Sequence, residues 1–114
     1  MKTLSKTQLK CIEKMKSDID TARDCETFRE YIIKTNSFLR GRLEKNPNYL
    51  DENIEYFTNH YEKYYEERKK GNVLVAGYGK PTINALEKMG IVTVIKYEQD
   101  RSHGVIDWVH LNNY

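Results

Sequence analysis

The spacing of apolar residues changes at Gly71, and this change limits the possible folds more than any other feature of the chain. Before Gly71, apolar side chains recur every three or four residues, which is the period of a helix that buries one face. After Gly71, short runs rich in β-branched residues replace this period and indicate strands. We therefore expect an α+β fold. Its 114 residues suit one domain, with a helical part over 1–71 and a strand–helix–hairpin part over 72–114.

Three helices are expected in the helical part. The first begins at Ser5, and Gln8 stands three residues later, where it completes a capping box. The second is expected over 24–46, where an Asn-Pro pair ends it, and the third over 51–70. Gly71 suits the position just after a helix C-terminus, because glycine tolerates the left-handed conformation found there.

A strand, a short helix and a β-hairpin are expected in the remainder. The strand covers 73–76, and the helix starts near Pro81, a residue favoured in the first helical turn, and ends at Gly90. Two strands over 91–98 and 105–111 then form the hairpin.

The glycine-rich stretch 77–82 raises the question of a phosphate-binding loop. A P-loop needs a glycine where Leu74 stands and a serine or threonine where Pro81 stands, and a dinucleotide fingerprint needs a glycine in place of Thr82. The chain also lacks the repeated βαβ alternation that both motifs require. We therefore expect the glycines only to allow a tight bend from strand to helix.

Residues 80–92, with the sequence KPTINALEKMGIV, are followed by the hairpin and resemble the recognition-helix end of a winged-helix domain. In such a domain 73–76 would be the small first strand, although here it follows three helices. The resemblance implies that the exposed side of the short helix enters a DNA major groove and that the hairpin tip touches phosphates. The residues that it assigns to these contacts are Lys80, Thr82, Asn84, Lys88, Arg101 and His103.

The charge balance argues against DNA binding as the leading function. The net charge is only +2, whereas neutralised phosphates supply most of the affinity of a DNA-binding protein. Glu87, Asp100 and Asp107 also lie close to the residues assigned to DNA. DNA binding is therefore the alternative function.

Tyrosines gather on the third expected helix and suggest a different kind of partner. Tyr56 and Tyr65 fall outside its apolar stripe, and Glu62 and Glu66 belong to an acidic side of the same helix. Tyrosine offers a large contact area with a polar tip and is enriched at protein interfaces. These four residues are the candidate protein-binding residues, and the alternative that the tyrosines complete the core stays open.

No residue pattern points to catalysis, a cofactor or a metal. The histidines and cysteines show no metal-ligand spacing. Cys11 neighbours the stripe of the first helix, where a buried thiol is the common outcome, and a Cys11–Cys25 disulfide is not expected. No apolar run approaches the roughly 20 residues that span a bilayer. We expect a cytoplasmic protein that is not an enzyme.

The sequence therefore favours a small non-enzymatic protein-binding module. Small proteins without catalytic motifs are common in phages and mobile elements, where some inhibit host machinery, including CRISPR effectors. By this analogy the chain is expected to be an inhibitor of the anti-CRISPR kind, with a winged-helix DNA-binding regulator as the alternative. Pairing of the hairpin edge with a second copy, to give a homodimer, is left open.

Overall fold

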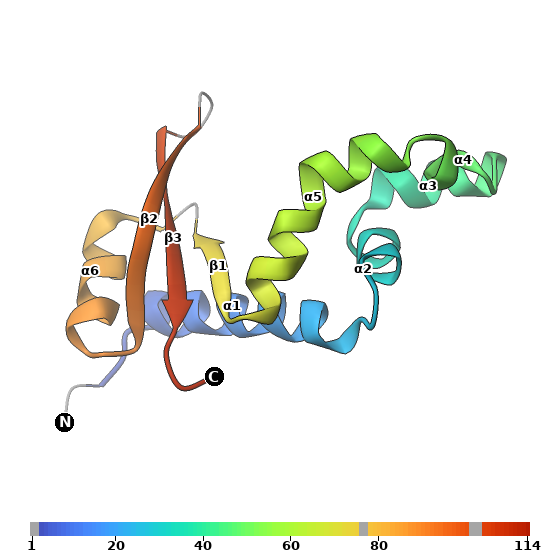
Figure 1. The fold of residues 1–114 in the computed structure, drawn as a ribbon. Helices are drawn as coiled ribbons and strands as arrows, with labels where there is room; N and C mark the ends of the chain where they lie inside the picture. The colour runs from blue at the N-terminus through green and yellow to red at the C-terminus, as the bar shows by residue number, and fades with distance from the viewer. Residues whose placement is uncertain (1–2, 76–77, 101–103) are drawn as a thin grey trace.

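The computed structural model describes residues 3–75, 78–100 and 104–114, and its fold is α+β. Within this part of the chain, six helices accompany one three-stranded antiparallel sheet. The elements are α1 (Lys6–Asp24), α2 (Phe28–Thr35), α3 (Ser37–Lys45), α4 (Tyr49–Glu52), α5 (Ile54–Lys69), β1 (Asn72–Val75), α6 (Lys80–Lys88), β2 (Val92–Asp100) and β3 (Gly104–Leu111). The molecule is elongated, with extents of 53 × 30 × 22 Å (Figure 1). None of the helices described has the length and apolar character needed to cross a membrane.

Helix α1 joins the two halves of the molecule. The predicted capping box is confirmed, because the Gln8 N–H donates to Ser5 Oγ (3.1 Å) and the Ser5 N–H donates to Gln8 Oε1 (2.9 Å). Along most of its length α1 packs on the sheet through residues such as Met15, and near its end Ala22 packs against the other helices. Figure 1 shows it running beneath both halves. The N-terminal helix therefore contributes to the core of the strand–helix–hairpin part.

The sheet has the strand order β1-β3-β2, so the predicted hairpin is confirmed and β1 joins it through β3. Val73 of β1 lies opposite Val109 of β3, and both are buried with Leu86 of α6 and Met15 of α1. Helices α1 and α6 thus cover one face. Trp108 points to the other face, because side chains alternate along a strand, and its indole is buried to 1% exposure.

The helices α2, α3, α4 and α5 form what we call the helical lobe. Their shared core includes Ile32, Leu39, Leu50 and Phe57. The prediction of two helices in this region was wrong, because each is divided in two. Asn36 has an extended backbone between α2 and α3, and its side chain accepts the Leu39 N–H (3.0 Å), as expected of a residue that favours caps over helix interiors.

The start of α2 also differs from the prediction. Asp24 is the last residue of α1, and α2 begins at Phe28 after the N-cap Thr27. The Thr27 hydroxyl oxygen accepts the Glu30 N–H (3.2 Å). This Thr-x-x-Glu spacing is a helix-start signal that the sequence reasoning missed.

Glycines end two helices as predicted. Gly71 follows α5 with φ +90° and Gly90 follows α6 with φ +75°, both in the region that favours glycine. Gly79 behaves differently from the prediction, because its φ of −69° is open to any residue. The bend from β1 to α6 therefore does not need a glycine at 79, and Gly77 lies outside the described residues.

Candidate functional site

The structure separates the tyrosines of α5 into core and surface. Tyr65 was predicted to lie at an interface, and this is wrong, because the side chain is only 2% exposed. Its hydroxyl donates to the carbonyl oxygen of Cys25 (2.8 Å), and its ring lies 5.0 Å from that of Tyr31. Helix α5 contacts both α1 and α2, so its buried side is wider than the single stripe used for the prediction.

Tyr56 is exposed, as the sequence predicted. Its side chain is 52% exposed, although neighbouring rings hold it in place. The His60 ring centre lies 4.2 Å from that of Tyr56, and the Phe57 ring meets it edge-on at 5.2 Å. Tyr56 therefore presents a large, positioned ring to solvent.

Glu62 and Glu66 are exposed, but they do not form one compact site with Tyr56. At 100° per residue, they lie about 120° and about 80° around the helix axis from Tyr56. Glu66 is also paired with Lys69 (Nζ to Oε1, 3.3 Å). The acidic side and the exposed tyrosine thus occupy different sides of α5.

Phe38 of α3 is a surface residue that the sequence reasoning did not select. It is 58% exposed, and the Arg42 guanidinium lies 5.0 Å from its ring centre. The same guanidinium lies 5.9 Å from the ring centre of Tyr49. Phe38 stands beside the stripe of its helix, and this position was the available signal that it would not be buried.

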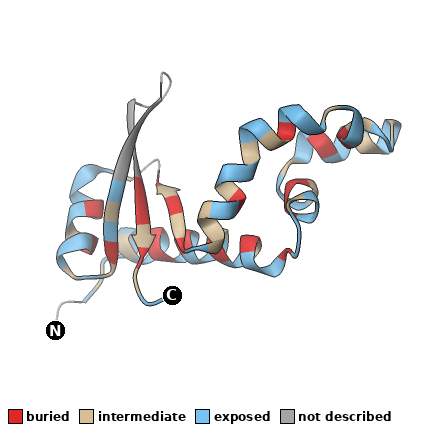
Figure 2. Cartoon of the chain, viewed as in Figure 1, coloured by how far each residue is buried: buried red, intermediate tan, exposed pale blue. Residues whose placement is uncertain are grey.

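Ring contacts connect Phe38 with Tyr56 through the core of the helical lobe. Ring centres are separated by 6.5 Å between Phe38 and Tyr49, 6.3 Å between Tyr49 and Phe57, and 5.2 Å between Phe57 and Tyr56. We call these four residues the distal aromatic cluster. Its inner member Phe57 is buried at 2% exposure, whereas the two ends of the cluster, Phe38 and Tyr56, are exposed. Figure 2 shows buried and exposed positions alternating along the helices of the lobe.

The residues assigned to DNA contact fall into three groups. Lys80, Asn84 and Lys88 are exposed and lie at i, i+4 and i+8, on one side of α6. Thr82 is half-buried on a different side of the helix. Arg101 and His103 lie outside the described residues, so the hairpin-tip contacts stay a prediction.

Glu87 has a structural contact that the sequence did not suggest. Its Oε2 accepts the backbone N–H of Val94 (3.1 Å), next to the irregularity in β2 between Val94 and Lys96. The carboxylate thereby ties α6 to β2, which is an edge strand of the sheet. A side chain that binds an exposed strand N–H also protects that edge from pairing with another chain.

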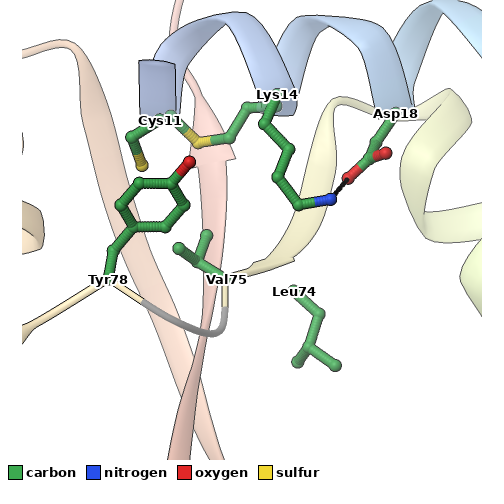
Figure 3. Close-up of a pocket in the computed structure, with 7 residues that line it drawn as sticks. Cys11, Lys14, Asp18, Leu74, Val75 and Tyr78 are labelled. Carbon is green, nitrogen blue, oxygen red and sulfur yellow. Dashed lines mark ion pairs between the residues drawn. The ribbon is translucent and has the colours of Figure 1, made fainter. Parts of the chain in front are cut away.

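The cysteines occupy structural positions. Both are free thiols and both are buried, and burial raises the pKa of Cys11. Figure 3 shows Cys11 in a small hollow between α1 and β1, with Tyr78 across from it and a Lys14–Asp18 ion pair (3.7 Å) at its side. Within the described residues, no group of three His, Cys, Asp or Glu side chains is arranged to hold a metal ion.

Comparison with known proteins adds no family to this picture. No protein-family model matches the chain, and no curated protein or solved structure matches it either.

Proposed function

We propose that this chain is a small non-enzymatic binding protein that contacts another protein through the exposed rings at the two ends of the distal aromatic cluster. The observation that carries the proposal is the exposure of two large aromatic side chains there, Phe38 at 58% and Tyr56 at 52%. Both belong to the distal aromatic cluster, so ring contacts restrict their movement in the unbound protein.

The physical reason is the gain from covering these rings. Fully burying a side chain such as phenylalanine is worth roughly 1.5–3 kcal/mol. Rings that are already positioned lose little conformational freedom on binding. Arg42 lies against Phe38, and arginine and aromatic residues are the types enriched where interface energy concentrates.

The narrower hypothesis is an inhibitor of host machinery from a phage or mobile element, of the anti-CRISPR kind. It is supported by analogy with small binding proteins of that class. We place the binding in the cytoplasm, because two free, buried thiols suit a reducing compartment.

The test is capture of a partner from nuclease-treated lysate by the tagged protein and three variants. Phe38→Ala and Tyr56→Ala remove the exposed rings. Leu9→Ala is the matched control, because Leu9 is also an exposed apolar residue (45%) but lies on α1, at the other end of the molecule. We expect the parent and the control to retain the same discrete protein and the two ring variants to retain at least ten-fold less.

Equal capture by all four proteins would remove this surface as the interface. Loss of capture in Leu9→Ala alone would move the interface to α1. A thermal melt of each variant separates lost contacts from lost folding.

DNA binding is kept as a second candidate because one observation favours it. Lys80, Asn84 and Lys88 share an exposed side of α6, which the winged-helix resemblance assigns to the DNA groove. If the candidate holds, affinity for DNA falls steeply as salt rises, and Lys88→Ala makes that dependence shallower by about one phosphate contact. An unchanged salt dependence in this variant would remove α6 as the DNA contact.

A further inference from the structure

A groove between α2 and α5 has an open space of about 630 Å³. Its walls combine aromatic rings, short polar side chains and one cationic side chain. They are formed by Tyr31, Ile32, Thr35, Asn36, Tyr61, Tyr64 and Arg68. This groove is distinct from the exposed ends of the distal aromatic cluster.

Arg68 brings an unbalanced positive charge to the groove. Among the described residues no carboxylate pairs with it, and its Nη1 donates to the hydroxyl of Tyr31. The Nε of Arg68 is buried and has no hydrogen-bond partner among the residues that the structure describes. The carboxylate of Asp18 contributes to raising the pKa of Tyr31, but its ion-pair partner is Lys14 (3.7 Å) and not Arg68. A buried polar group without a partner is costly, so a ligand that supplies an acceptor and a negative charge would be favoured here.

Tyr31 provides a second donor beside Arg68. Burial raises the pKa of its hydroxyl, which therefore stays protonated at neutral pH. The oxygen accepts from Arg68, and the hydroxyl hydrogen has no acceptor among the described residues. One cation and one hydroxyl donor thus meet at the same place.

Stacked rings fix the groove walls. The Arg68 guanidinium lies 5.9 Å from the ring centre of Tyr64, and the Tyr64 ring is nearly parallel to that of Trp108, 5.8 Å away with 14° between the planes. Tyr61 stacks on Phe57 at 6.0 Å. The site is therefore formed before a ligand arrives, which lowers the entropy lost on binding.

We propose that this groove binds the side-chain carboxylate of an aspartate or glutamate on a partner protein, with Arg68 as counter-ion and Tyr31 as second donor. A guanidinium matches a carboxylate in charge and geometry. The lining contains one positive charge, which one carboxylate balances, whereas a phosphate dianion calls for more. The ring faces suit the methylene groups of the acidic side chain. The assignment to a protein ligand rests on the proposed protein-binding function.

The test uses a blocked tripeptide, acetyl-Gly-Glu-Gly-amide, and its glutamine counterpart, titrated into the full chain. Binding is followed by the ¹H–¹⁵N signal of Arg68 Nε–H and by the fluorescence of Trp108, the single tryptophan in the sequence. We expect saturable shifts with the glutamate peptide and at least ten-fold weaker binding of the glutamine peptide. Arg68→Met should abolish the difference between the two peptides. Arg29→Met is the matched control and should leave it unchanged, because Arg29 is an exposed arginine of α2 that pairs with Asp51 and does not line the groove.

Three results would overturn the proposal. The first is equal binding of both peptides, and the second is a glutamate preference that survives in a folded Arg68→Met protein. The third is tighter binding of inorganic phosphate or free glutarate than of the glutamate peptide, which would assign the groove to a phosphate or to a small organic acid. If Arg68→Met does not fold, the proposal is judged from the binding of the glutamate and glutamine peptides to the parent protein and to Tyr31→Phe. Because no natural partner is needed, failure here is distinguishable from failure of the capture experiment.

Discussion

Replacing Tyr65 by phenylalanine tests the division of the α5 tyrosines into core and surface. The substitution keeps the ring, which packs against Tyr31 at 5.0 Å and Phe28 at 6.2 Å, and removes only the hydroxyl. That hydroxyl donates to the carbonyl oxygen of Cys25 over 2.8 Å in a buried site. In the variant this carbonyl loses its donor where water has little access.

The expected loss of stability follows from the cost of a buried group without a partner. Such a group costs roughly 1–3 kcal/mol, so we expect the free energy of unfolding to fall by about 2 kcal/mol. Unfolding entropies near 2.1 cal/mol/K per residue give about 0.24 kcal/mol/K for a chain of this length, and the melting temperature should fall by about 8 °C. Tyr56→Phe is the control, and at 52% exposure it should change stability by less than about 0.5 kcal/mol.

The measurement is urea unfolding of the parent and both variants, followed by circular dichroism and checked by thermal melts. A Tyr65→Phe protein whose unfolding free energy lies within about 0.5 kcal/mol of the parent would refute the buried hydrogen bond. Equal losses in the two variants would refute the division of the tyrosines itself.

Three further outcomes are expected. Gly71→Ala should lower the unfolding free energy by about 2 kcal/mol in urea titrations, because a φ of +90° strains any other residue and the new Cβ would lie 3.1 Å from the His110 ring. Gly41→Ala, inside a helix with nothing within 4 Å of the new Cβ, should instead raise it by about 0.5–1 kcal/mol; a loss there would contradict the open site. Arg29 bonds Asp51 (2.6 Å) and lowers the pKa of that carboxyl. The small stabilisation from this exposed pair is therefore complete above the ordinary aspartate pKa and is lost as pH falls through the lowered value. NMR titration should show a lowered pKa for Asp51. Arg29→Gln should return this pKa to its ordinary value, and added salt should reduce the shift.

The sequence predicted the features that depend on neighbouring residues. The capping box of Ser5 and Gln8, the glycine ends at Gly71 and Gly90, and the hairpin are all set within a few positions of the chain. The division of the expected second helix at Asn36 is also local, since asparagine favours caps over helix interiors. It was missed because the apolar stripe continues across Asn36.

The candidate site was only partly predictable. Tyr56 is exposed as its place outside the stripe indicated, and Phe38 gave a similar but weaker signal. Nothing in the sequence placed Arg68 beside Tyr31, because 37 positions separate them and the contact exists only where α2 packs on α5.

The sequence by itself determined where the helices and strands form and where most of them end, because caps, glycines and apolar periods act over a few residues. The tertiary structure decided which side chains are buried. Tyr65 is core because α5 packs against both α1 and α2, and Trp108 is core because α5 also reaches the second face of the sheet. Burial depends on which faces of distant elements meet, and the period of a single helix records only that one of its sides is apolar.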